Sequence, residues 1–254
     1  MKGTPMFSYQ LYSSRNFPPM AATFEMLAKA GYTSVEGYGA LYADDAAVAA
    51  TQAGLAATGL TMPTGHFSLA MLEGEVDKVL AIARALKMER LYCPHIMPQD
   101  RPTDAVGWRA FGERLQRVGA PYKAAGYGFG WHNHDFEFKP LSDGSIPQDR
   151  MFEGGPGLEW EIDVAWVIRG GADPLAWIEK YKDRITAAHV KDIAPAGECT
   201  DEDGWADVGH GTIDWPAIMA ELRAIGVRHF VMEHDNPKDH ARFAQRSIAS
   251  AKTF

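Results

Sequence analysis

The chain has 254 residues, of which 46% are hydrophobic and 23% charged, a composition typical of globular proteins and not of disordered or fibrous ones. Asp and Glu number 33 against 25 Lys and Arg, and the resulting formal charge of −8 argues against a nucleic-acid partner, whose phosphates require Lys and Arg. Two cysteines are too few for a disulfide framework, and no apolar run is long enough to span a membrane. Because the first residues also lack a signal-peptide pattern, we expect a cytoplasmic protein with no membrane partner.

Short apolar or β-branched runs, typical of buried strands, alternate along the chain with longer segments of helical period. The predicted strands are Phe7–Leu11, Thr33–Gly37, Thr61–His66, Arg90–His95, Tyr127–His134, Leu158–Asp163, Arg184–His189 and His229–Glu233. The predicted helices are Pro19–Ala30, Asp44–Thr58, Glu75–Lys87, Asp104–Ala125, Pro174–Lys182, Trp215–Ile225 and a last one from Lys238. Glycines directly after several of these segments, such as Gly31 and Gly59, are typical of helix C-termini.

The strands recur at roughly the thirty-residue period of a βα unit, and a (β/α)8 barrel typically has about 250 residues. The sequence therefore predicts an α/β protein, a single (β/α)8 TIM barrel that spans residues 1–254 as one domain. A doubly wound sheet is disfavoured because the first strand is followed by Tyr12–Arg15 and not by a glycine-rich phosphate turn. Two polar segments, Leu141–Gly157 and Asp192–Gly211, follow strands and should lie at the face where barrel enzymes build their sites.

The predicted fifth and sixth strands alternate with period two, which assigns one face of each strand to the barrel interior. In the fifth strand, glycines share the inward face with His132 and His134, so the glycines leave room in a crowded interior and the histidines emerge at the mouth. In the sixth strand the inward residues are Glu159, Glu161 and Asp163. Three buried carboxylates need cations, and we expect a metal ion above Asp163 and a basic partner such as Arg184 deeper in the barrel.

Histidines gather at the same predicted face. Those at or near the carboxyl ends of predicted strands are His66, His95, His132, His134, His189 and His234. A mixed set of imidazoles and carboxylates suits a borderline divalent ion. The sequence therefore predicts one divalent metal ion, with Mn²⁺ favoured and Co²⁺, Zn²⁺, Fe²⁺ or Mg²⁺ as alternatives.

Four stretches make the chain resemble the sugar-phosphate isomerase/epimerase family of the xylose-isomerase-like barrels. They are Trp131–Phe138, Ile162–Trp166, His189–Asp192 and Val208–Trp215. The resemblance covers nearly the whole chain and implies a sugar isomerase or epimerase on a TIM barrel, with inosose dehydratases and endonuclease IV-type repair enzymes among its relatives.

In this family one divalent metal is held by Glu, Asp, His and Glu from the last four strands. Carried over by the resemblance, the last three of these ligands are Asp163, His189 and Glu233. Where many ketose epimerases have the first Glu, this sequence offers His132, with His134 as its competitor. A histidine-rich fifth strand is similar to that of the inosose dehydratases, which weakens a simple two-glutamate epimerisation.

The remaining candidates have both a functional and a structural interpretation. Glu36 is expected to bind a sugar hydroxyl or to form an interior salt bridge, and Lys191 to neutralise an oxyanion or to lie solvated in a loop. Glu137 is expected to contact substrate or to pair with Arg150 or Lys139. Two further residues, His66 and Trp166, are expected to line the pocket.

The hypothesis for function is a metal-dependent isomerase or epimerase that acts on a ketose or keto-polyol by proton transfer through a metal-bound enediolate. Glu233 and His134 are the candidate bases. The alternative is a lyase that eliminates water or a glycosyl group on the same barrel. The expected partner is a small sugar or polyol; a homo-oligomer is compatible with the sequence, and a repair endonuclease is disfavoured by the acidic charge.

Overall fold

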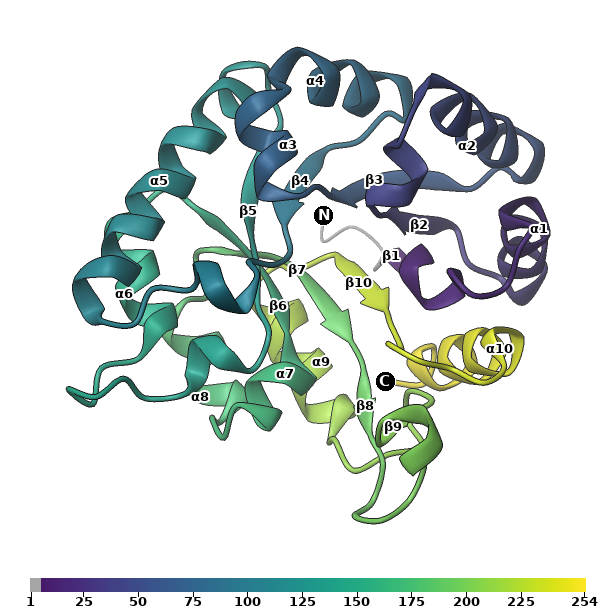
Figure 1. Cartoon of the computed structure of the whole chain (residues 1–254). Helices are drawn as coiled ribbons and strands as arrows, with labels where there is room; N and C mark the ends of the chain where they lie inside the picture. The colour runs from purple at the N-terminus through teal and green to yellow at the C-terminus, as the bar shows by residue number, and fades with distance from the viewer. Residues whose placement is uncertain (1–5) are drawn as a thin grey trace.

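The computed structural model describes residues 6–254 and shows, within them, a closed barrel of eight parallel strands surrounded by helices (Figure 1). Around the barrel the strands follow the order β1-β10-β7-β6-β5-β4-β3-β2. Their bounds are β1 Met6–Gln10, β2 Ser34–Gly37, β3 Thr61–His66, β4 Arg90–Cys93, β5 Gly128–His132, β6 Glu159–Asp163, β7 Ile185–Val190 and β10 His229–Met232. This is the (β/α)8 TIM barrel that the sequence predicts.

Helices connect consecutive strands on the outside of the barrel. Their bounds are α1 Met20–Ala30, α2 Asp45–Thr58, α3 Leu69–Gly74, α4 Val76–Ala85, α5 Ala105–Ala124, α6 Pro147–Gly154, α7 Val164–Arg169, α8 Pro174–Lys180, α9 Trp215–Ala224 and α10 His240–Ala251. Three short helices, α3, α6 and α7, were not predicted. As expected, Gly31 and Gly59 follow α1 and α2 with φ of +96° and +74°, a left-handed conformation that glycine adopts without strain.

The outward faces of the strands form the main core with the helices. In β5, the ring of Trp131 packs 5.4 Å from that of Phe111 on α5, and Phe129 stacks 5.7 Å from Tyr122 on the same helix. All four of these side chains are buried. The alternation read from the sequence therefore assigns the correct face of β5 to the helices.

The inward face of β5 is glycine-rich because the barrel interior is crowded. A Cβ on Gly130 would lie 2.3 Å from the carbonyl oxygen of Glu159, and one on Gly128 would lie 2.6 Å from Cγ of Arg90. Arg90 reaches across Gly128, and its Nε donates to Glu159 at 3.1 Å. The prediction that Arg184 pairs with the inward carboxylates of β6 is wrong. Its guanidinium donates instead to the carbonyls of Gly155 and Phe152.

The segment 141–157 contains α6, which packs closely against α5. A Cβ on Gly112 of α5 would lie 1.9 Å from the carbonyl oxygen of Met151, and one on Gly154 would lie 1.9 Å from that of Arg109. The two glycines therefore let the helix backbones approach each other, and α5 and α6 support the β5 side of the barrel.

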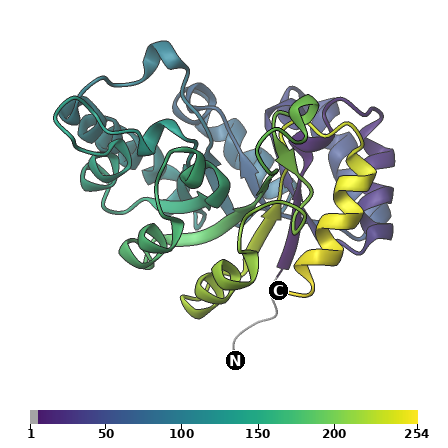
Figure 2. The ribbon, with the colours of Figure 1, turned by 90° about the horizontal axis from the view of Figure 1, so that it is seen from below.

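The segment 192–211 carries a small antiparallel pair, β8 Asp192–Ile193 and β9 Trp205–Ala206. In Figure 2 this segment lies at the opposite end of the barrel from the C-terminus of α10. The carboxylate of Asp192 accepts backbone hydrogen bonds from Gly209 and Gly211, so the stretch from Gly209 to Gly211 forms a turn around this carboxylate. Between residues 6 and 254, no helix is long and apolar enough to cross a membrane.

Candidate functional site

The carboxyl ends of the barrel strands surround a cavity of about 1000 Å³. Five of the residues predicted for the site line it, namely His66, His132, His134, Trp166 and Glu233. The other five lie buried behind the cavity wall, namely Glu36, Glu137, Asp163, His189 and Lys191. Half of the predicted residues thus meet the cavity, and the other half support its wall from behind.

Four predicted residues come together where the cavity is deepest in the barrel: His132 and Glu233 from its lining, and Asp163 and His189 from behind it. We call these four residues the ligand cluster. Each offers one ligand atom, and these atoms all lie within 4.8 Å of one another. They come from the end of β5, the end of β6, the body of β7 and the residue after β10. Because parallel barrel strands end at one face, side chains from residue 132 to residue 233 of the chain meet there.

Lys191 is buried among the carboxylates of the ligand cluster. Its Nζ lies 3.3 Å from Oδ2 of Asp163, 2.9 Å from Oε2 of Glu233 and 2.9 Å from Oδ1 of Asp235. Burial alone would lower the pKa of Lys191, but these three carboxylates raise it above its ordinary value. Lys191 is therefore a charged interior partner of the cluster: it is neither solvated in a loop nor part of the cavity lining, the two positions considered from the sequence.

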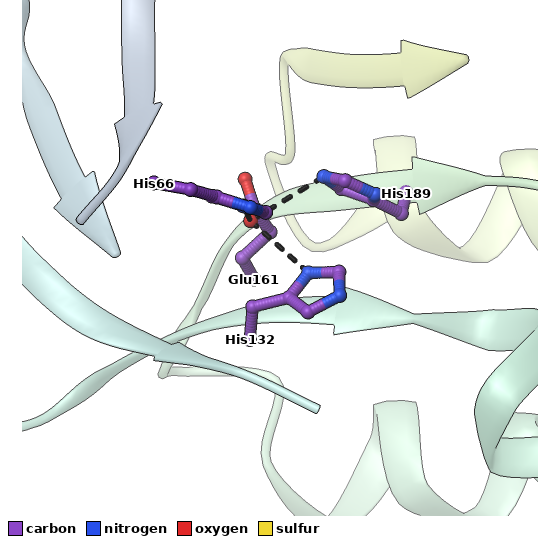
Figure 3. Close-up of side chains that lie close together, drawn as sticks. All are labelled: His66, His132, Glu161 and His189. Carbon is purple, nitrogen blue, oxygen red and sulfur yellow. Dashed lines mark hydrogen bonds and ion pairs between the residues drawn. The ribbon is translucent and has the colours of Figure 1, made fainter. Parts of the chain in front are cut away.

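A second group adjoins the ligand cluster and consists of Glu36, His66 and Glu161. We call it the lower cluster. Figure 3 shows Glu161 pointing between His66, His132 and His189. Its Oε2 lies 2.5 Å from Nε2 of His66, 3.2 Å from Nδ1 of His132 and 3.4 Å from Nε2 of His189. Glu161 thus connects the lower cluster to two residues of the ligand cluster.

Glu36 completes the lower cluster from β2. Its Oε1 lies 2.7 Å from Nε2 of His189 and accepts a hydrogen bond from Nε2 of Gln10 at 2.7 Å. Of the two interpretations given by the sequence, the structure therefore supports the interior ion pair for Glu36. Burial raises the pKa of Glu36, and the nearby Glu161 raises it further, whereas His66 and His189 oppose this shift.

The ligand cluster fits a divalent cation on its own chemistry. Oδ2 of Asp163 is buried and has no hydrogen bond in the described residues, and its charge is met only by the ion pair with Lys191 at 3.3 Å. Glu161 engages Nδ1 of His132, which leaves Nε2 as the nitrogen for a ligand, the arrangement that carboxylates commonly impose on metal-binding histidines. Two carboxylates and two imidazoles are also a donor set that borderline divalent ions accept.

The four residues His66, His132, Glu161 and His189 also offer ligand atoms within 4.8 Å of one another. In this group, however, Glu161 is already hydrogen-bonded to His66 at 2.5 Å. The group also has two members, His132 and His189, in common with the ligand cluster. His66 and Glu161 therefore serve better as hydrogen-bonded support for the ligand cluster than as metal ligands.

His134 lies just beyond the end of β5, in the loop that follows, and not within a longer strand as predicted. Its Nδ1 is buried without a hydrogen-bond partner in the described residues. Burial, together with His132 and Lys191, holds the pKa of His134 well below its ordinary value, so its imidazole is neutral. A neutral ring with a free nitrogen beside the ligand cluster can accept a proton.

Glu137 holds His134 from behind. One carboxylate oxygen accepts the backbone N–H of His134 at 3.0 Å, and the other accepts Nε1 of Trp131 at 2.9 Å. Burial raises the pKa of Glu137 to about 8. Neither Arg150 nor Lys139, the partners considered from the sequence, contacts this carboxylate: Arg150 pairs with Glu153 and Lys139 with Asp135. Glu137 therefore shapes the loop and does not line the cavity.

Two further residues contribute to the site in ways that the sequence does not predict. Oδ1 of Asn133 accepts hydrogen bonds from Nε1 of Trp160 and from the backbone of Asp163, both at 2.9 Å, and so ties β5 to the end of β6. His95 was noted at a strand end but given no role; its Nε2 meets Nη2 of Arg101 at 3.1 Å at the cavity edge. The signal for Asn133 was its place between two histidines, and its contacts with β6 could not be read from one strand.

Comparison with known proteins agrees with this architecture. The family model of the xylose isomerase-like TIM barrel matches residues 24–252. No curated protein matches the sequence. A sugar phosphate isomerase/epimerase from Parabacteroides distasonis is similar in structure, with a TM-score of 0.81, 22% identity, and 97% of this chain and 93% of that chain covered.

Two further solved structures share the fold at low identity. The 3-keto-D-glucoside 4-epimerase from E. coli has a TM-score of 0.70 and 16% identity, with 99% of this chain and 100% of that chain covered. The IolI protein, solved with a zinc atom, has a TM-score of 0.72 and 14% identity, with 98% of this chain and 95% of that chain covered. At such identities the likeness shows the fold.

Proposed function

The chain belongs to the xylose isomerase-like TIM barrel family, and we propose that it is a divalent-metal-dependent sugar isomerase or epimerase. Its substrate would be a ketose or keto-polyol, and its reaction would move a proton on a carbon next to the carbonyl. The observation that carries this proposal is the convergence of His132, Asp163, His189 and Glu233 at the base of a cavity of about 1000 Å³.

The proposed ion is held by the ligand cluster, with Mn²⁺ favoured and Co²⁺, Zn²⁺, Fe²⁺ or Mg²⁺ compatible with the same donors. When bound, the ion would supply Lewis-acid stabilisation of the charge that develops on the carbonyl oxygen, a contribution of several kcal/mol. Lys191 would favour the ionised forms of Asp163 and Glu233, because its ammonium lies within 3.3 Å of both, and at Asp163 it opposes the rise in pKa that burial causes.

Glu233 and His134 are the proposed proton-transfer groups. Burial would raise the pKa of Glu233, but Lys191 and His189 hold it well below its ordinary value, so Glu233 is a carboxylate. Its contacts with His189 and Lys191 both use Oε2, which leaves Oε1 to take a proton. His134 is neutral and could receive that proton or deliver one from a second direction.

The proposed substrate contacts are the polar groups that meet the cavity. Trp166 lines it, and its buried Nε1 has no hydrogen-bond partner between residues 6 and 254, so this N–H is available to a sugar hydroxyl. His66 also lines the cavity and is oriented by Glu161. Three residues expected to bind substrate have other proposed roles. Glu36 would orient His189, and Glu137 would orient His134. Lys191 would orient the carboxylates of the ligand cluster.

The test combines metal analysis with solvent deuterium exchange into a panel of ketoses, inososes and 3-keto-glycosides. We expect close to one divalent ion per chain and exchange at a carbon beside the carbonyl. Glu233→Gln should reduce the exchange rate at least 1000-fold, an order of magnitude typical for loss of a transferring group. The matched control is Glu113→Gln on the exposed face of α5, which should keep the wild-type rate.

Two results would contradict the proposal: full exchange in metal-free protein, or full exchange in Glu233→Gln with the fold intact. Analysis of the product shows which reaction follows the removal of a proton from the carbon next to the carbonyl. Return of the proton gives an isomer or epimer, whereas loss of a β-hydroxyl or β-glycosyl group would assign the chain to the lyase alternative.

A further inference from the structure

The cavity continues from the ligand cluster to a rim built by the loops after β1 and β2. Its lining includes His132 and Glu233 at the floor and Tyr12, Arg15 and Tyr38 at the rim. A volume of about 1000 Å³ is at the upper end of the range for small-molecule sites. A single sugar ring on the ligand cluster would therefore fill only part of the space.

The rim presents an aromatic side chain that the fold does not bury. Tyr12 is 40% exposed, whereas most large aromatic side chains of residues 6–254 lie in the core. Its ring contacts that of Tyr38 edge-on at 5.6 Å and 81°. The guanidinium of Arg15 lies 3.9 Å from the centre of the same ring. An exposed aromatic ring with a polar tip is suited to a ligand that is apolar on one face and hydroxylated at its edge.

The backbone of Tyr12 is fixed by the residues that also support the floor. Its N–H donates to Oε1 of Gln10 at 3.1 Å, and its carbonyl accepts Nη1 of Arg15 at 3.0 Å. The amide nitrogen of the same Gln10 side chain donates to Glu36 in the lower cluster. Tyr12 is therefore held in place before any ligand arrives, which lowers the entropic cost of binding.

The charges around the cavity disfavour an anionic ligand. The carboxylates that line it are Glu73, Asp100, Asp203, Glu233 and Asp235. The cations in the same lining are Arg15 and Arg114. The guanidinium of Arg114 is held by both oxygens of Glu73 at 2.6 Å, and Arg15 is held against Tyr12. A phosphorylated sugar would meet more negative than positive charge on its way to the floor.

We propose that Tyr12, Arg15 and Tyr38 form an outer subsite for a second, uncharged sugar ring, so that the substrate is a glycosylated keto sugar and neither a free nor a phosphorylated monosaccharide. This inference rests on the proposed function for what occupies the floor. The keto sugar would lie on the ligand cluster, and the glycosidically linked ring would lie against Tyr12.

Calorimetry with the metal-loaded protein tests the subsite through binding alone. Each keto sugar of the panel is supplied in three forms: free, O-glucosylated and phosphorylated. We expect the glucosylated form to bind about tenfold more tightly than the free form, and the phosphorylated form to bind no more tightly than the free form. Tyr12→Ala should remove the tenfold preference and leave the Kd of the free sugar unchanged.

Two control variants separate the ring from general damage. Tyr12→Phe keeps the aromatic face and should keep the preference, and Val106→Ala removes an exposed apolar side chain elsewhere and should change nothing. Equal Kd values for the free and glucosylated forms, tighter binding of the phosphate, or binding of no glucosylated sugar would overturn the subsite.

The failure of the subsite can be told from the failure of the proposed reaction. Tyr12-dependent binding of a glucosylated sugar without deuterium exchange would keep the subsite and overturn the reaction. Exchange with equal KM for free and glucosylated sugars would keep the reaction and overturn the subsite.

Discussion

The two halves of the barrel mouth differ in how they treat charge and solvent. The β5–β10 half contributes the ligand cluster and Lys191, which are buried and paired with one another. The β1–β4 half contributes Tyr12, Tyr38 and His95, which are partly or largely exposed to the cavity. Groups that must hold charge at fixed distances are enclosed by rigid strands, whereas groups that would recognise a ligand lie on loops beside open space.

The enclosed half also has more cross-strand connections. Asn133 ties β5 to β6, and Asp163 caps α7 by accepting the N–H of Trp166 at 2.9 Å. Glu161 reaches from β6 to imidazoles on β3, β5 and β7. The comparison therefore predicts that substitutions in this half affect metal binding, and that substitutions at the partly or largely exposed residues of the other half, Tyr12, Tyr38 and His95, affect ligand recognition or local titration.

The largest effect is expected from Asp163→Asn. The amide keeps the cap of α7 but removes the negative charge, so the Kd for Mn²⁺ should rise by roughly 100-fold or more. Competition with a chelator of known affinity measures this without reference to activity. Glu159→Gln is the matched control, since it lies lower on β6 and pairs with Arg90 outside the cluster. An unchanged Kd for Asp163→Asn would remove Asp163 from the ligand set.

A smaller loss is expected from Glu161→Gln. Its carboxylate orients His132 and His189 without belonging to the ligand cluster, and supporting residues of this kind typically change metal affinity by about 10- to 100-fold. The order of the two variants decides between the two candidate groups of four residues. If Glu161→Gln weakened metal binding more than Asp163→Asn did, the ion would be held by His66, His132, Glu161 and His189 and not by the ligand cluster.

The fold could be predicted because its signals are local. The strands are short apolar or alternating segments, and glycines such as Gly31 and Gly59 mark helix ends through their backbone conformation. The helices that were missed, such as α6 and α7, have only 8 and 6 residues, too few for a helical period to stand out. Their stability comes from close packing, as at Gly112, which the sequence of one segment does not reveal.

The ligand cluster could be anticipated from strand ends, but the partners of each charge could not. Alternation tells which face a residue occupies and not its height in the barrel or its neighbours. Arg90 reaches Glu159 because Gly128 between them has no side chain, a relation that spans three strands. In the same way Lys191 lies on the chain beyond β7 yet pairs with Asp163 and Glu233 from β6 and β10.

The smallest effect is expected in the open half, at His95. Burial lowers the pKa of His95 below its ordinary value of 6.5, and the positive charge of Arg101 lowers it further. Arg101→Gln removes the second cause only, so the pKa of His95 should rise but remain below 6.5. Ring-proton NMR titration measures the change directly.

The sign of the accompanying stability effect follows from proton linkage. A histidine with a lowered pKa binds its proton in the unfolded chain first, so its contribution to stability is present above pH 6.5 and lost as the pH falls. Arg101→Gln should therefore make the loss of stability below pH 6.5 less steep. His134, whose pKa is held well below 6.5 by burial among charged groups of the enclosed half, should stay neutral through the same titration in both proteins. Titration of His134 near pH 6.5 would show that the two halves do not differ in solvent access.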